Sequence, residues 1–175
     1  MPKITTLWKE FLHPVQAFPK TARYTRALAY ASAKHAGQTR IGGNPYITHP
    51  IAVAGIVRDW GYGAPYQLAA LFHDLLEDTD ASEQQIVRLG GKRVLQAVKC
   101  LTKTPGYRMD TYIGGIRNNR IARVVKAADR LHNLRCAHVA NDAFKRKYIK
   151  ESMEWYLDFS PEILPAVKQL EDSLQ

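Results

Sequence analysis

Four residues of types that bind divalent cations occur in order along this chain: His49, the adjacent pair His73 and Asp74, and Asp129. Two imidazoles and two carboxylates can hold a divalent cation while coordination positions stay open for water and a substrate. A buried carboxylate without a partner is very costly, and a cation is one of the few ways to offset that cost. The set therefore predicts a metal centre. Its nitrogen and oxygen donors suit Mn²⁺, Fe²⁺, Co²⁺ or Zn²⁺, and the lack of cysteine in it argues against a structural zinc site.

Two further carboxylates, Glu77 and Asp78, close the segment HDLLED at positions 73–78. On a continuous helix His73 would share a face with Glu77, and Asp74 with Asp78, because residues four apart lie above one another. Metal coordination lowers the pKa of bound water, so hydroxide becomes available near neutral pH to attack phosphorus. Glu77 and Asp78 are then candidates to orient that water and to move its proton. The alternative is an ordinary acidic helix end.

Length and composition indicate one globular domain, which we expect to span residues 1–175. Hydrophobic residues make up 46% and charged residues 23%, both ordinary for such a domain. No apolar stretch is long enough to span a bilayer, and the start MPKITTLWKEFL lacks the apolar core of a signal peptide. We therefore expect a cytoplasmic protein with no membrane partner. Cys100 and Cys136 are too few for a disulfide framework and are expected to be buried thiols.

The formal net charge of +9 favours an anionic partner, and phosphate-rich nucleotides, RNA, DNA and acidic membranes all qualify. Charge alone does not choose between them, and solubility is a sufficient explanation. Tyr112 lies among the basic residues and could either close over a ribose or pack in the core. The basic residues that could form a rim attracting a polyanion are Lys34, Arg40, Lys103, Arg108, Arg117 and Arg120.

Helical periodicity dominates the sequence, and no alternating run is long enough to make a convincing sheet. We therefore expect an all-α fold. Pro50 suits the first turn of a helix, so His49 is expected at a loop-to-helix junction. The helix that carries the His73 and Asp74 pair is apolar nearly all round over most of its length, which predicts a central, buried position. The expected helices cover residues 22–36, 50–60, 65–79, a short one from Ser82 to Gly90, 92–101, 119–139, and one or two from Asp142 onward.

Several motifs, in the same order and spacing, resemble the HD-type metal-dependent hydrolase domain of the RelA/SpoT family. They are HAGQTR with GNPYITHP, then ALFHDLLEDT, then LTK, then VVKAADRLHNLR, and the match covers residues 24–156. The family removes the 3′-pyrophosphate from ppGpp and pppGpp. Because the sequence leaves no room for a synthetase domain, it most resembles the stand-alone small alarmone hydrolases, of which the animal Mesh proteins are one branch. The resemblance implies a helical bundle of roughly eight to ten helices.

The resemblance also implies manganese-dependent hydrolysis that yields GDP or GTP and pyrophosphate, with a nucleotide as the partner and no nucleic acid. Arg40 would lie against the guanine, and Asn133 would hydrogen-bond the nucleotide. Arg130 and His132 would support the helix or its neighbours. Lys126 is expected to pair with an acid rather than to contact phosphate. The implied ligands of one Mn²⁺ are His49, His73, Asp74 and Asp129, with Glu77 and Asp78 serving the attacking water.

The chain departs from the family pattern after Arg40, where Ile41 and Gly42 replace the usual Lys and Ser. Two polar contacts to the substrate are expected to be missing, while the metal chemistry is untouched. Cys136 stands where many relatives carry Thr, so one stronger hydrogen-bonding group is absent. The same chemistry on ppApp, NADPH or a nucleoside phosphate is one alternative. Another is a non-catalytic nucleotide-binding or RNA-binding module, although no RNA-binding motif is evident.

Overall fold

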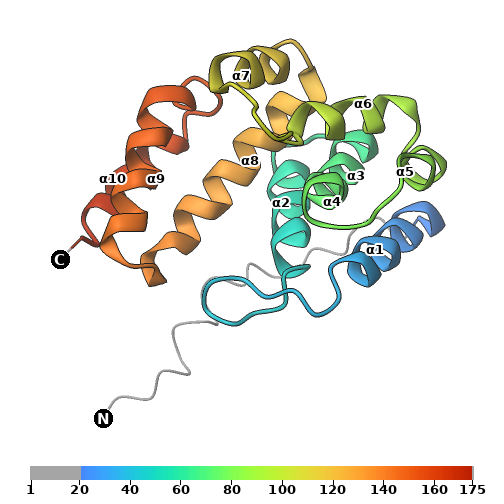
Figure 1. Cartoon of the computed structure of the whole chain (residues 1–175), viewed down its shortest axis with the longest axis horizontal. Helices are drawn as coiled ribbons and strands as arrows, with labels where there is room; N and C mark the ends of the chain where they lie inside the picture. Colours follow the sequence, from blue (N-terminus) through green and yellow to red (C-terminus); the bar gives the residue numbers. More distant parts are fainter. Residues whose placement is uncertain (1–20, 175) are drawn as a thin grey trace.

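The computed structural model describes residues 21–174, and this part of the chain forms ten α-helices and one short 3₁₀ turn. Extended pairing within it is limited to one isolated bridge between Thr39 and Pro45. The expected all-α bundle is therefore confirmed (Figure 1). The elements are α1 (Ala22–Lys34), α2 (Thr48–Asp59), α3 (Ala64–Phe72), α4 (Leu75–Asp78), α5 (Glu83–Gly90), α6 (Lys92–Leu101), α7 (Met109–Arg117), α8 (Arg120–Cys136), η1 (Ala137–Val139), α9 (Asp142–Trp155) and α10 (Ile163–Glu171).

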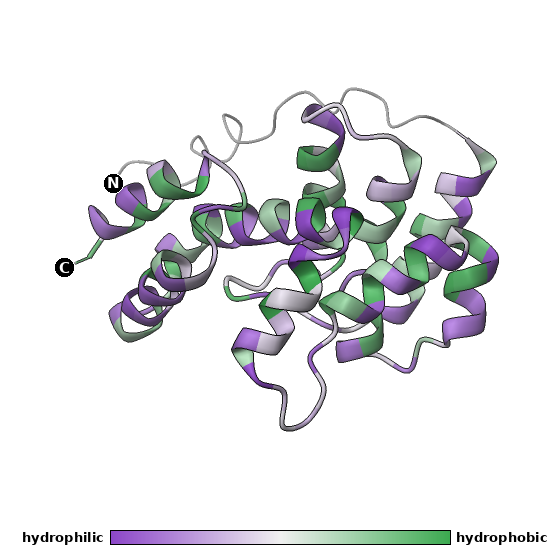
Figure 2. Ribbon diagram, turned by 90° about the horizontal axis from the view of Figure 1, so that it is seen from above, coloured by the Kyte–Doolittle hydropathy of each residue, from purple (hydrophilic) through white to green (hydrophobic). Residues whose placement is uncertain are grey.

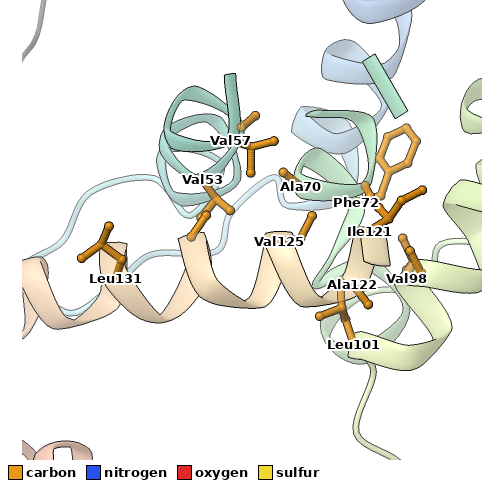
Figure 3. Packing of buried hydrophobic residues seen from close by; sticks show 14 of the residues in the cluster. Val53, Val57, Ala70, Phe72, Val98, Leu101, Ile121, Ala122, Val125 and Leu131 are labelled. Atoms are coloured by element: carbon orange, nitrogen blue, oxygen red, sulfur yellow. The ribbon is translucent and has the colours of Figure 1, made fainter. Parts of the chain in front are cut away.

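The long helix α8 joins the two parts of the bundle. Helices α2, α3 and α6 pack against α8 and form one part (Figure 1). Helix α10 also packs against α8 and, together with α9, forms the other part. Figure 3 shows the core at the first of these contacts, where Val125 of α8 lies near Ala70 of α3 and Val53 of α2. All three side chains are fully buried. Burial of a valine or leucine contributes about 1.5–3 kcal/mol, so this contact fixes how the helices that carry the candidate ligands sit together.

Polar side chains define several helix starts. Ser82 accepts a hydrogen bond from the Gln85 backbone nitrogen at 3.3 Å, which confirms the cap expected from the sequence. Asn119 does the same for α8 and Asn141 for α9. Such caps satisfy backbone N–H groups that have no partner inside the helix. They also fix where α8 begins, and with it the register of Asp129.

The expected continuous helix over residues 65–79 was wrong, because it is interrupted by a turn at His73 and Asp74 and divides into α3 and α4. Asp74 has φ −98° and ψ −5°, outside ideal helical values. The His73 ring nitrogen Nδ1 bonds the Ala70 carbonyl at 2.7 Å and so takes a backbone acceptor of the last turn of α3. Glu77 follows this break, and its carboxylate accepts a hydrogen bond from the Lys103 backbone nitrogen at 2.8 Å.

Helix α7 was not expected from the sequence. The adjacent pair Gly114 and Gly115 lowers its intrinsic helix propensity, which hides the element from a propensity argument. Tertiary packing compensates, because Tyr112, Ile113 and Ile116 are buried against the neighbouring helices. Tyr112 also donates a hydrogen bond to the Leu101 carbonyl at 2.9 Å, which makes it a core residue rather than a group free to close over a ribose.

The expected closing helices are present as α9 and α10. Pro161 lies in the break between them, and Pro165 lies in the first turn of α10, where a missing backbone N–H is tolerated. Figure 2 shows hydrophilic and hydrophobic patches on the same helices, the pattern of amphipathic helices around a shared core. Across residues 21–174, no helix combines the length and apolarity that crossing a bilayer requires.

Candidate metal centre and adjoining pocket

Three elements meet at the candidate metal centre. His49 lies in the first turn of α2, His73 and Asp74 lie at the junction of α3 and α4, and Asp129 lies in the middle of α8. The side chains of His49, His73 and Asp129 are almost completely buried, and 20% of the Asp74 side chain is exposed. The fold thus brings His49, His73 and Asp129 together as a group that could hold a metal ion, with Asp74 beside His73. The open side of the cluster is the side of Asp74.

The donor atoms of His49, His73 and Asp129 all lie within 4.8 Å of one another, close enough to hold one cation. His49 Nε2 is 3.1 Å from both His73 Nε2 and Asp129 Oδ1, and the latter two atoms are 3.7 Å apart. Asp74 Oδ2 is 3.1 Å from His73 Nε2 and 3.7 Å from His49 Nε2. Ligands about 2.1 Å from a common ion are about 3.0–3.4 Å apart in octahedral or tetrahedral geometry. The residues present therefore fit a divalent ion with nitrogen and oxygen ligands.

The hydrogen bonds of the two imidazoles indicate which ring nitrogens face the candidate metal centre. The carbonyl of Ala70 can only accept, so His73 Nδ1 donates to it, and in the neutral ring Nε2 presents a lone pair to the centre. His49 Nδ1 lies 2.8 Å from His132 Nδ1. When His49 donates there, its Nε2 also presents a lone pair to His73 Nε2. A proton on His73 Nε2 relieves the repulsion between these lone pairs and the two carboxylates, and a cation in the centre can take the place of that proton.

The charges around the centre keep its carboxylates ionised. Burial raises the pKa of Asp129, but the Lys126 ammonium and the two imidazoles outweigh burial and hold this pKa well below 3.8. Burial lowers the pKa of His73, but the Asp74 and Asp129 carboxylates outweigh it and raise the pKa to about 10. The cluster therefore attracts positive charge strongly. A metal ion that enters must compete with a proton for His73.

Residues behind the ligands hold them in place. Lys126 Nζ donates to Asp129 Oδ2 at 2.8 Å, which confirms that this lysine pairs with an acid. Asn133 Nδ2 donates to Asp129 Oδ1 at 2.6 Å. Burial and the neighbouring His49 lower the pKa of His132 to about 3, so this ring is neutral beside His49. His132 therefore supports a candidate ligand directly.

The two spare carboxylates have different surroundings. The Tyr46 hydroxyl lies 2.7 Å from Asp74 Oδ2 and 3.3 Å from Asp78 Oδ2, so it links Asp78 to a candidate ligand. Burial and the Asp74 carboxylate raise the pKa of Asp78. Glu77 instead accepts a hydrogen bond from the Lys103 backbone nitrogen at 2.8 Å. Sequence reasoning did not single out Tyr46, and a lone tyrosine in a loop gives no signal that it bonds two carboxylates.

A pocket of ≈ 280 Å³ adjoins the centre and contains both predicted substrate-binding residues. Arg40 Nη2 donates to Asn133 Oδ1 at 2.7 Å, which ties the loop after α1 to α8. Phe144 and Tyr148 of α9 also line the pocket. Their rings are stacked, with centroids 5.3 Å apart and an interplanar angle of 12°. Sequence reasoning missed both aromatic residues. Their spacing of four residues was the available signal, because it places them on one helix face.

The proposed basic rim is largely neutralised by neighbouring acids. Lys34 pairs with Asp80, Arg108 with Asp110 and Arg117 with Asp158, each at 2.8–2.9 Å. Lys103 lies over the rings of Tyr107 and Tyr112 at 5.3 and 5.5 Å, and Arg120 is exposed at the start of α8. Of the residues nominated for the rim, Arg40 is the one that lines the pocket.

The chain is similar to proteins of a known domain family. The HD domain family model matches residues 27–110, which contain three of the four candidate ligands. A Synechocystis protein named probable guanosine-3′,5′-bis(diphosphate) 3′-pyrophosphohydrolase is 34% identical over 141 residues, covering 74% of this chain and 18% of the relative. The Escherichia coli K12 bifunctional (p)ppGpp synthase/hydrolase SpoT is 34% identical over 145 residues, covering 77% and 21%. The chain thus spans about a fifth of the length of these curated relatives.

A solved structure is similar over nearly its whole length. It is described as a metazoan ortholog of SpoT that hydrolyzes ppGpp and plays a role in starvation responses, and its TM-score is 0.65 at 26% identity. The alignment covers 90% of this chain and 94% of that one. The fold and the ligand cluster define an HD-domain protein. Within that class, the chain belongs with the SpoT-like proteins that the motifs in the sequence indicate.

Proposed function

We propose that this protein hydrolyses the 3′-pyrophosphate ester of ppGpp and pppGpp, with GDP or GTP and pyrophosphate as products. The observation that carries the proposal is the adjacency of two features. The donor atoms of His49, His73 and Asp129 are clustered at 3.1–3.7 Å with Asp74 beside His73, and next to them lies a pocket with a guanidinium, an amide and stacked aromatic rings. The first feature suits a phosphate-activating cation, and the second suits a nucleoside. Relatives named for this reaction support the same assignment.

We assign Mn²⁺ as the cofactor, held by His49, His73, Asp74 and Asp129. A bound divalent cation lowers the pKa of a coordinated water and screens phosphoryl oxygens. Asp78 is placed to accept the proton of the attacking water, because its raised pKa brings it nearer to the operating pH of a general base. Tyr46 orients Asp74 and keeps Asp78 close to it.

Glu77 has a separate part in this proposal. Its hydrogen bond with the Lys103 backbone holds one carboxylate oxygen at the start of the loop over residues 102–108. The other oxygen is left to orient water at the outer side of the centre. Glu77 is thus a second candidate for serving the attacking water. Within the described part of the chain, the Tyr46 hydroxyl links Asp78, but not Glu77, to the candidate ligand Asp74.

In the pocket, Arg40 lies 6.0 Å from the Tyr46 ring centroid and donates to Asn133, so its planar group is held in one orientation. Such a group can stack on a purine or bind its acceptor edge. The stacked pair Phe144 and Tyr148 offers an aromatic surface to the same base. We therefore assign Arg40 and Asn133 as substrate-binding residues. A cytoplasmic location, where such nucleotides occur, belongs to the same proposal.

The test is incubation of the purified chain with ppGpp and Mn²⁺, followed by chromatographic separation of the nucleotides. We expect GDP and pyrophosphate in equal amounts, and no release of single phosphates. His73→Ala should abolish the reaction, while His138→Ala, at an exposed histidine outside the site, should leave it unchanged. Absence of pyrophosphate release across a range of Mn²⁺ concentrations would overturn the proposal.

A second candidate keeps the chemistry and changes the substrate. Ile41 lines the pocket with 60% of its surface exposed, at a position where the family pattern has lysine. An isoleucine supplies no cationic contact to a phosphate and no hydrogen bond to a base. A panel of ppGpp, ppApp, NADPH and nucleoside phosphates separates the two candidates. Higher kcat/KM for one of the others than for ppGpp would favour the second.

A further inference from the structure

A second pocket, of ≈ 380 Å³, lies between α1 and α5. Figure 1 shows these two helices beside each other, at the opposite end of the bundle from α9 and α10. On α1 the lining residues are three, four and seven apart and so share one face, and on α5 Gln85 precedes Arg88 and Leu89 by three and four residues. None of them lines the pocket at the candidate metal centre. The lining residues are Arg23, Arg26 and Tyr30 of α1, and Gln85, Arg88 and Leu89 of α5.

Three guanidinium groups line this pocket without an acidic partner among residues 21–174. Arg23 uses Nε to donate to the Leu89 carbonyl at 2.7 Å, which anchors α1 to the end of α5 and leaves its Nη groups available. Arg26 and Arg88 are exposed and form no ion pair with the described acids. The two acids closest to Arg88 in the sequence, Glu83 and Asp80, are paired elsewhere, with Lys99 and Lys34, each at 2.8 Å. The positive charge of the pocket is therefore uncompensated by the described side chains.

The Tyr30 hydroxyl adds an independent observation. It is shielded from solvent and has no hydrogen-bond partner in the described part of the chain. Its ring packs edge-on against Phe72 with centroids 6.3 Å apart, so the core holds it in place. A buried hydroxyl without a partner is unfavourable, and because Tyr30 also lines the pocket, an acceptor that reached the hydroxyl from there would satisfy it. A donor that lacks an acceptor, beside three unpaired cations, indicates an anionic ligand.

We propose that this pocket binds the phosphate group of a multiply charged anion, at a site separate from the candidate metal centre. Guanidinium groups present paired N–H donors that match phosphate oxygens, and charge-assisted bonds of this kind are strong. Gln85 supplies one further donor for an oxygen. The volume is sufficient for pyrophosphate or for the phosphates of a nucleotide. This inference does not depend on the hydrolytic reaction proposed above.

The probe is inorganic pyrophosphate, titrated calorimetrically into the full chain in a buffer that contains a chelator. The chelator prevents the candidate metal centre from holding the probe through a cation. In the double variant Arg26→Gln/Arg88→Gln, the dissociation constant should rise by about tenfold or more. The matched control is Arg120→Gln/Arg146→Gln, which removes two charges from exposed arginines elsewhere and should change binding by less than about twofold.

Tyr30→Phe keeps the ring against Phe72 and removes only the hydroxyl, so it should weaken pyrophosphate binding by about threefold or more. A parallel titration with GDP identifies the source of the phosphate. Tighter binding of GDP that is lost in the same variants assigns the site to a nucleotide, and weaker binding assigns it to an inorganic anion. The proposal is overturned if the wild type does not bind pyrophosphate in chelator, or if both double variants weaken binding equally.

Discussion

Arg40 Nη2 donates to Asn133 Oδ1 at 2.7 Å, although 93 residues separate the two in sequence. The same asparagine donates through Nδ2 to Asp129 Oδ1 at 2.6 Å. One amide therefore forms both hydrogen bonds, one with the residue that we propose binds a base and the other with a candidate metal ligand. The position of the pocket is thus tied to the position of the metal centre through a single side chain.

Asn133→Ala breaks this link on both sides. We expect kcat/KM for pyrophosphate release to fall by about 10- to 100-fold, because one hydrogen bond to a charged group is lost at each end. Steady-state kinetics with Mn²⁺ provide the measurement. Asn118→Ala, at an exposed asparagine at the end of α7, is the matched control and should retain full activity. Equal activity of the two variants would remove Asn133 from the site.

His132→Ala removes the ring that lies 2.8 Å from His49 Nδ1. Loss of such an orienting partner typically lowers metal affinity by about 10- to 100-fold, and we expect a loss of that size here. Competition between the protein and a fluorescent chelator for Mn²⁺ measures the effect. His138→Ala serves as the control, because His138 is exposed and bonds only the Arg135 carbonyl among the described residues. An unchanged affinity in His132→Ala would mean that His49 is oriented without it.

Lys126→Met leaves the Asp129 carboxylate buried without its ammonium partner. The free energy of unfolding in chelator should fall by about 3–5 kcal/mol, as for other broken buried ion pairs. Chemical denaturation measures it, with the exposed Lys92→Met as the control. The pKa of Asp129 is held below its ordinary 3.8, so the pair stabilises the wild type above that pH. Its contribution should be lost as the pH falls toward the lowered pKa, and a wild type and variant that lose stability in parallel would contradict this account.

Tyr46→Phe removes the hydroxyl between Asp74 and Asp78 and keeps the ring. Burial and the Asp74 carboxylate raise the pKa of Tyr46, so in the wild type the phenol remains a donor at neutral pH. We expect kcat to fall by about tenfold or more, with little change in KM, since the hydroxyl contacts carboxylates rather than the pocket's base-binding surface. Tyr107→Phe, at a tyrosine that is 43% exposed, provides the comparison. A change confined to KM would instead place Tyr46 among the substrate contacts.

Much of the candidate site was predictable from the sequence, because metal ligands come from few residue types. His49 and Asp129 could be nominated from their chemistry before anything was known of their spacing in three dimensions. The aromatic wall was not predictable in the same way. Phe144 and Tyr148 belong to a residue class whose usual place is the core, so their type alone does not distinguish a pocket wall from ordinary packing.

The errors in the fold have local causes. A propensity argument continues a helix through His73 because it does not see that the ring nitrogen bonds the Ala70 carbonyl. It passes over α7 because Gly114 and Gly115 are poor helix formers, whereas burial of Ile113 and Ile116 decides the outcome. Both are cases in which a tertiary or side-chain interaction overrides a local preference. After the break, Glu77 bonds the Lys103 backbone nitrogen, whereas Asp78 lies 3.3 Å from the Tyr46 hydroxyl.

The central claim is that four side chains from α2, the α3–α4 junction and α8 share one divalent cation. Crystals of the Mn²⁺-loaded protein, measured near the manganese absorption edge, test it most directly. The account predicts one anomalous peak per chain, about 2.0–2.3 Å from His49 Nε2, His73 Nε2, Asp74 Oδ2 and Asp129 Oδ1. A fully loaded protein whose anomalous peak lies elsewhere, with these four groups bonded only to one another, would contradict it.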